Sequence, residues 1–134
     1  MTGGLIKMEW NTNLKGLQHI GIPTNDMDAT VEFYEKIGFE IAHEAKDGDV
    51  RVVFLKLGSL MLETYENNAA VLKDGAVDHI AFDVADIEEA YKFITGLGIK
   101  ILTEITYLPF WDNGIKFFIA QGPNMERLEF AQYL

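Results

Sequence analysis

The chain of 134 residues contains no cysteine and only two arginines, Arg51 and Arg127. Without cysteine there is no disulfide framework and no thiol chemistry, which fits the reducing cytoplasm where we expect the protein to reside. With so few arginines, few side chains are available for a bidentate grip on a carboxylate or a phosphate.

Basic charge and long apolar runs are also scarce. The 11 lysines and arginines face 21 aspartates and glutamates, which gives a net charge of −10. Such a chain repels a phosphate backbone on average, so nucleic acid is not an expected partner. No apolar run approaches the roughly 18 residues of a membrane-spanning helix, so no membrane span is expected. Residues 1–13 lack the charged start and the apolar run of a secretory signal, and we interpret them as an N-terminal tail.

The sequence does contain an internal repeat. Residues 17–41 align without gaps on residues 77–101, and six positions of the first copy are identical in the second: His19, Ile20, Asp26, Phe33, Gly38 and Ile41. A hydrophobic content of 49% is sufficient for one domain core, which we place at residues 14–134. The repeat divides this domain into two equivalent modules, at residues 14–68 and 75–134.

Each module is predicted to form one strand, one helix and three further strands, an α+β arrangement. Alternating apolar residues predict opening strands at 17–23 and 77–84. Asp26 and Asp86 are suitable N-caps for helices that end near residues 37 and 97, before Gly38 and Gly98. Turn residues separate further strands at 39–46, 50–57 and 60–66, and at 99–105, 115–121 and 127–132.

A longer connection at residues 106–114 holds Tyr107, Pro109, Phe110 and Trp111. Its aromatic side chains are expected either to plug the core or to line a pocket.

Four polar side chains occupy matching places in the two modules. Because strand residues alternate between faces, Ile20 and Ile22 are expected under the helix, and His19 points to the opposite face. His79 does the same in the second module. The last strand of each module adds one carboxylate between apolar neighbours, Glu63 and Glu129 respectively.

Two histidines and two glutamates suit a borderline divalent metal such as nickel, zinc, cobalt, iron or manganese. A single histidine or glutamate in a strand is more often a core or solvated residue than a ligand, but this arrangement recurs in register in both copies. His43 has no counterpart, because Thr103 stands at the matching position, and we expect it at the surface.

The repeat and its motifs resemble the vicinal oxygen chelate superfamily, which includes glyoxalase I, methylmalonyl-CoA epimerase, extradiol dioxygenases and the fosfomycin and bleomycin resistance proteins. The resemblance extends from about residue 17 to residue 134 and is strongest at residues 18–22, 77–82 and 122–130. It implies two tandem βαβββ modules forming a cup-shaped mixed sheet around a metal ion. It also implies His19, Glu63, His79 and Glu129 as the metal ligands.

The resemblance further implies a reaction. Four protein ligands favour redox-neutral chemistry of the glyoxalase or epimerase kind, in which a base removes a proton beside a metal-chelated carbonyl of a small-molecule substrate. Glu129 is the first candidate for that base and Glu63 the second. Glyoxalase I usually carries an arginine soon after the first ligand that helps to hold glutathione. Residues 20–24 contain none, so the resemblance does not imply glutathione as the substrate.

Two other functions are compatible with the same likeness. One is a metalloenzyme of the dioxygenase or fosfomycin type, and the other is a metal-free ligand-binding protein similar to the bleomycin resistance proteins. Small members of the superfamily commonly pair, and some share the metal site between subunits, so a homodimer is expected.

Overall fold

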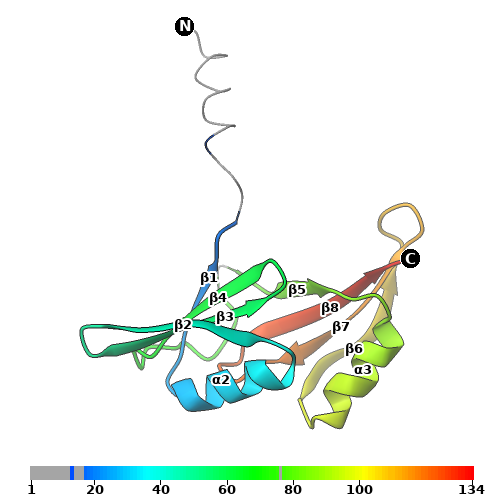
Figure 1. The fold of residues 1–134 in the computed structure, drawn as a ribbon. Coiled ribbons are helices and arrows are strands. Elements are labelled where there is room, and N and C mark those ends of the chain that lie inside the picture. The colour runs from blue at the N-terminus through cyan, green and yellow to red at the C-terminus, as the bar shows by residue number, and fades with distance from the viewer. Residues whose placement is uncertain (1–12, 14–16, 76) are drawn as a thin grey trace, which may run out of the picture.

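The structure is a computed structural model that describes residues 13, 17–75 and 77–134 (Figure 1). The predicted N-terminal tail therefore lies almost wholly outside the described residues. The first module consists of β1 (Ile20–Pro23), α2 (Met27–Lys36), β2 (Glu40–Asp47), β3 (Val50–Leu57) and β4 (Leu60–Tyr65). The second consists of β5 (Ile80–Asp83), α3 (Ile87–Gly96), β6 (Ile101–Leu108), β7 (Ile115–Gln121) and β8 (Arg127–Tyr133).

Each module forms its own four-stranded mixed sheet. The strand orders are β1-β4-β3-β2 and β5-β8-β7-β6, in which the first pair of each sheet is parallel and the other pairs are antiparallel. The predicted tandem βαβββ fold is thus confirmed. The mixed sheet is not closed: it consists of one four-stranded sheet per module, because among the described residues β1 and β5 each bond only to the last strand of their own module.

The two helices begin and end where the sequence predicts. The carboxylate of Asp26 accepts a hydrogen bond from the amide of Ala29, and that of Asp86 accepts one from the amide of Glu89. These N-cap bonds satisfy amides that have no partner inside a helix. After each helix, Gly38 at φ +110° and the equivalent glycine, Gly98, at φ +76° adopt the left-handed conformation that ends it. None of the described helices is long and apolar enough to cross a membrane.

Both helices cover the same side of the molecule, so the opposite faces of the two sheets are left open (Figure 1). The core lies between the sheets and the helices, where Ile22 and Phe82 are buried and Ile20 and Ile80 are partly buried, as predicted. Residues at the alternate strand positions, among them His19 and His79, therefore belong to the open faces.

One strand is longer than predicted. β6 extends to Leu108, so Tyr107 lies in the strand and not in the following loop. Its ring packs so closely on Gly114, which has φ +93°, that a side chain there would collide with it. In the other sheet, every residue of the edge strand β2 is exposed, and the charges of its Glu, Lys and Asp residues discourage unwanted strand pairing.

Polar and aromatic contacts join the two modules on the helix side. The hydroxyl of Tyr34 in α2 donates to Oε2 of Glu126 over 2.6 Å, although the two residues are 92 positions apart. The side-chain amide of Asn124 donates to the hydroxyl of Thr30 over 3.0 Å. The rings of Phe39 and Phe82 meet edge to face with centroids 6.0 Å apart. These contacts fix the orientation of one module relative to the other.

The Tyr34 hydroxyl is expected to contribute strongly to stability, because Tyr34 is fully buried and its hydroxyl donates to a carboxylate. Replacement by phenylalanine should lower the free energy of unfolding by about 1.5–3 kcal/mol, the range for a hydrogen bond to a charged group. Burial, followed by the charge of Glu126, raises the pKa of Tyr34 well above 10.0. Since the folded-state pKa is the higher one, this contribution should be complete below pH 10 and decline only above it. Urea unfolding at pH 7 and at pH 10.5 measures both effects.

Tyr91 supplies a matched control, since its hydroxyl also donates to a carboxylate, that of Glu104, but at the surface. Tyr91→Phe should change the free energy of unfolding by no more than about 0.5 kcal/mol. Equal decreases in the free energy of unfolding of the two variants would show that the Tyr34–Glu126 bond stabilises the protein no more than a surface hydrogen bond.

Candidate functional site: two histidine–glutamate pairs

In the first module, β1 and β4 bring His19 and Glu63 together. Gly21 is the register partner of Glu63 in this parallel pair, and His19 lies two residues earlier on the same face. Nε2 of His19 is 3.4 Å from Oε1 of Glu63. The ring of Tyr65 lies against Gly21 on this face, so the two pair members sit beside an aromatic surface.

The second module repeats the arrangement with β5 and β8. Ala81 is the register partner of Glu129, and Nε2 of His79 is 3.6 Å from Oε1 of Glu129. The Glu129 side chain is 17% exposed, compared with 30% for Glu63. The prediction that each module directs one imidazole and one carboxylate to its open face is therefore confirmed.

The other ring nitrogen of each histidine also has a partner. Nδ1 of His19 is 3.0 Å from the side-chain oxygen of Gln18, and Nδ1 of His79 is 2.8 Å from a carboxylate oxygen of Asp78. The bond to His79 is the largest cause that lowers the pKa of Asp78. When Nδ1 carries the hydrogen and donates it outward, Nε2 presents its lone pair toward the glutamate, which is the form of histidine that binds metal ions.

The spacing within each pair fits a shared metal ion. Nitrogen and oxygen ligands about 2.0–2.2 Å from an ion, at angles between roughly 90° and 110°, lie about 3.0–3.5 Å from each other. The pair distances of 3.4 and 3.6 Å are at or just beyond the upper end of this range. The donor types, imidazole and carboxylate, are those that divalent transition metals accept.

The four predicted ligands do not meet within one chain. Among the residues that the structure describes, no group of three or more His, Asp or Glu side chains is placed to hold an ion. A single chain thus presents two half-sites, each with two donors. Whether the halves combine in an assembly stays a prediction.

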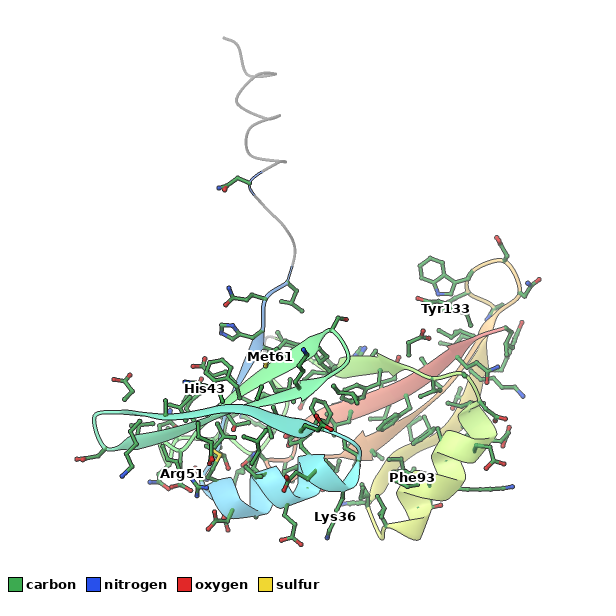
Figure 2. The ribbon with its side chains drawn as sticks, viewed as in Figure 1. Lys36, His43, Arg51, Met61, Phe93 and Tyr133 are labelled. Atoms are coloured by element: carbon green, nitrogen blue, oxygen red, sulfur yellow. The ribbon has the colours of Figure 1, made fainter. Side chains whose placement is uncertain are left out.

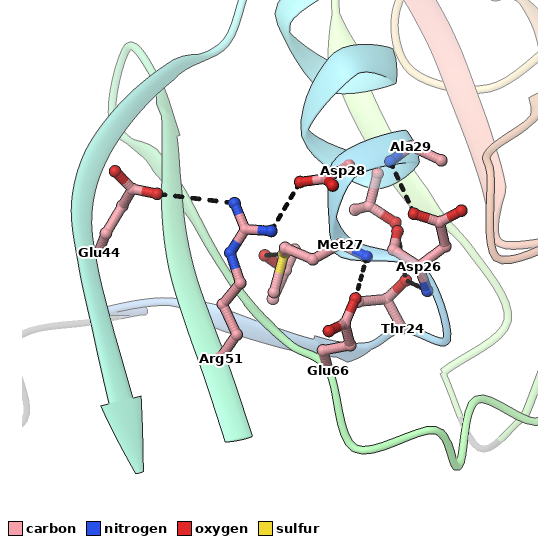
Figure 3. Close-up of polar contacts among 10 residues, drawn as sticks. Thr24, Asp26, Met27, Asp28, Ala29, Glu44, Arg51 and Glu66 are labelled. Atoms are coloured by element: carbon pink, nitrogen blue, oxygen red, sulfur yellow. Dashed lines mark hydrogen bonds and ion pairs between the residues drawn. The ribbon is translucent and has the colours of Figure 1, made fainter. Parts of the chain in front are cut away.

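The two arginines have different surroundings. Arg51 lies on the helix side, where it donates to Asp28 over 2.6 Å and approaches Glu44 at 3.9 Å (Figure 3). It is therefore directed away from the half-sites. Arg127 lies two residues before Glu129 in β8, and its Nε is 3.7 Å from the carboxylate of Asp78.

His43 is exposed, as expected, but it is not isolated from the first half-site. Phe54 in β3 pairs in register with His43 on one side and with Glu63 on the other, so the three side chains form a row on the open face. The Phe54 ring centroid is 5.7 Å from that of His19 and 6.1 Å from that of His43. Figure 2 shows Met61 on this same side of the sheet, with Lys36 on the helix side.

The aromatic residues after β6 do not plug the core. Phe110 is 56% exposed and Trp111 is 70% exposed. Trp111 adopts φ +63°, unusual for a large residue, and its ring packs edge to face on Tyr133 at 5.5 Å. The pocket-wall interpretation of this loop stays a prediction.

Sequence reasoning missed the residues that support the histidines. Gln18 and Asp78 stand at equivalent positions, one residue before each histidine, and both are polar. That pattern in the aligned copies was the available signal. Phe54 gave no such signal, because its place beside the half-site depends on strand register.

Known proteins with the same architecture support the family likeness. The family model described as Glyoxalase/Bleomycin resistance protein/Dioxygenase superfamily matches residues 16–130. The uncharacterized protein YwbC of Bacillus subtilis (strain 168) is 31% identical over 128 residues, which span 88% of this chain and 98% of YwbC.

Solved structures agree with this assignment. The glyoxalase family protein from Enterococcus faecalis is 28% identical, with a TM-score of 0.75 and coverage of 89% of this chain and 98% of that one. The structure of SMU.1112c also gives a TM-score of 0.75, at 26% identity, with coverage of 88% and 98%. The protein therefore belongs to the Glyoxalase/Bleomycin resistance protein/Dioxygenase superfamily.

Proposed function

We propose that the protein is a divalent-metal-dependent lyase or isomerase of the glyoxalase or epimerase type, acting on a small molecule with a carbonyl group. The observation that supports this most directly is the repeated pairing of Nε2 and Oε1, at 3.4 Å in one module and 3.6 Å in the other. Ion pairs at the surface contribute little to stability, so stability alone gives little reason for both copies of the repeat to hold the same two residue types at this place.

We further propose that the working unit is a homodimer in which each metal site combines His19 and Glu63 of one chain with His79 and Glu129 of a second. Two donors are too few for a stable transition-metal site, which commonly has three or four protein ligands. Within the described part of one chain no third donor is available. A second copy with its open faces turned toward the first would supply the missing pair.

The metal ion, when bound, would act as a Lewis acid that polarises the substrate carbonyl and acidifies the adjacent C–H bond. Glu129 is the proposed base that takes this proton and returns it at another carbon or on the other face. Its side chain is more enclosed than that of Glu63, so a proton that it takes from the substrate is better shielded from bulk water. Phe54 and His43 extend the open face beyond His19 and would contact the remainder of the substrate.

Metal analysis tests the first part of the proposal. The purified wild-type protein should contain about one divalent ion per chain, and His79→Ala and Glu129→Ala should each lose most of it, because a site with a missing ligand binds more weakly. Elemental analysis after dialysis measures the metal content. His43→Ala is the control and should retain the full content. A metal-free wild type, even after incubation with nickel, zinc, cobalt, iron or manganese, would instead favour a ligand-binding protein.

Mixing variants tests whether the site is divided between chains. The double variants His19→Ala/Glu63→Ala and His79→Ala/Glu129→Ala should each lack a complete site. When equal amounts of the two are unfolded together and refolded, half of the dimers should contain one chain of each variant. Each such dimer should regain one complete site, formed by the intact His19–Glu63 pair of one chain and the intact His79–Glu129 pair of the other.

Light scattering should give a dimer for each protein at micromolar concentration, and metal titration should count the restored sites. Absence of any recovery in dimers shown to be mixed would contradict a site shared between chains, and a monomeric wild type would contradict the dimer itself.

The role of Glu129 is tested by exchange of a substrate C–H for deuterium in heavy water. Small 2-hydroxycarbonyl compounds are suitable probes, with the metal-loaded protein followed by proton NMR. Glu129→Gln keeps an oxygen donor but removes the base, so exchange should fall by about 10²–10⁴-fold. Glu63→Gln should have a smaller effect. The reverse order would assign the proton transfer to Glu63.

A further inference from the structure

The two half-sites have the same ligands but different support, and the difference is one of charge. Behind His79 stands the carboxylate of Asp78, at 2.8 Å from Nδ1. Behind His19 stands the neutral amide of Gln18, at 3.0 Å. Since these residues occupy equivalent positions in the repeat, the first module serves as an internal reference for the second.

A carboxylate behind a histidine changes the ring as a ligand. It accepts the Nδ1 hydrogen in a charge-assisted bond, which fixes the tautomer and the ring orientation and increases electron density at Nε2. A side-chain amide can fix the orientation but carries no charge, so its effect on Nε2 is smaller. His79 should therefore be the stronger donor of the two.

Arg127 places a positive charge beside Asp78. It lies on the same face of β8 as Glu129, and its Nε, 3.7 Å from Asp78, is buried with no hydrogen-bond partner among the described residues. Its positive charge offsets Asp78 without a direct hydrogen bond, so the carboxylate stays free to accept from His79. In the first module Met61 stands two positions before Glu63, where the second module has Arg127. Both Met61 and Gln18 are uncharged, so this module lacks the anion and the cation that the second one has.

We propose that Asp78 and Arg127 are positioning residues that make the His79–Glu129 pair the stronger half of the metal site. The His19–Glu63 pair is the weaker half. The inference rests on the proposed metal function, but it concerns a difference between variants and can fail independently of it.

Cobalt titration of the full-length protein provides the test, with the visible absorption of bound Co²⁺ as the readout. Asp78→Asn removes the charge and should weaken Co²⁺ binding by about 10–100-fold, the usual effect of losing such a partner. Gln18→Asn is the matched control, since it alters the equivalent partner without a change of charge, and should have a clearly smaller effect. Asp78→Glu restores the carboxylate and should recover part of the affinity.

A second readout separates positioning from a general loss of structure. In the Co²⁺ protein, the Nδ1 hydrogens of bound histidines give strongly shifted, exchangeable proton NMR signals. Asp78→Asn should make the His79 signal exchange with water faster and leave the His19 signal unchanged. Arg127→Met, which introduces the residue of the first module, keeps the Asp78 carboxylate and should therefore have a smaller effect than Asp78→Asn. Urea unfolding of the metal-free variants checks that each one folds.

The outcomes are distinct. If the wild type binds no Co²⁺, the proposed metal function fails. If the wild type binds Co²⁺ and Asp78→Asn binds it equally well, or no worse than Gln18→Asn, the metal function stands and the inference about Asp78 and Arg127 is wrong.

Discussion

Each half-site forms within its own module, so the arrangement of the two half-sites depends on the contacts between the modules, and the carboxylate of Glu126 makes one of them. Its Oε2 accepts a hydrogen bond from the buried Tyr34 hydroxyl of α2. Its Oε1 accepts one from the backbone amide of Asn124, in the turn that precedes β8. The side chain folds back over Gly122, where a Cβ atom would collide with it. One carboxylate therefore closes the turn before β8 and attaches that turn to the other module. Pairing with β5 and β7 orients β8 and Glu129 within the second sheet, and the Glu126 contact ties the start of β8 to the first module.

Much of the fold could be predicted because local signals and the repeat agree. The N-cap aspartates, the left-handed glycines and the alternation of apolar residues are each readable in a single module, and the second copy confirms the reading. The pairing of His19 with Glu63 follows from the same alternation, once the first and last strands of a module are neighbours. The helix ends, the strands and the histidine–glutamate pairs could be assigned because the same residue types recur at equivalent positions of the two copies.

Other features depend on distances between residues far apart in the sequence. Nothing near Tyr34 indicates that its partner is Glu126, because that contact exists only when the two modules pack together. The same is true of the separation between the half-sites, since the sequence predicts their faces but not how the two sheets are arranged. The end of β6 is another such feature, because the strand continues through Tyr107, whose ring packs on Gly114 across the hairpin.

The half-site in each module has a thermodynamic consequence. If donors from two polypeptides hold one ion, ion binding and association of the polypeptides are coupled. The free energy by which the ion strengthens association then equals the free energy by which association strengthens ion binding. Dilution would then release the ion, and chelation would promote dissociation. A monomer–dimer equilibrium in such a protein would report on metal availability in its surroundings.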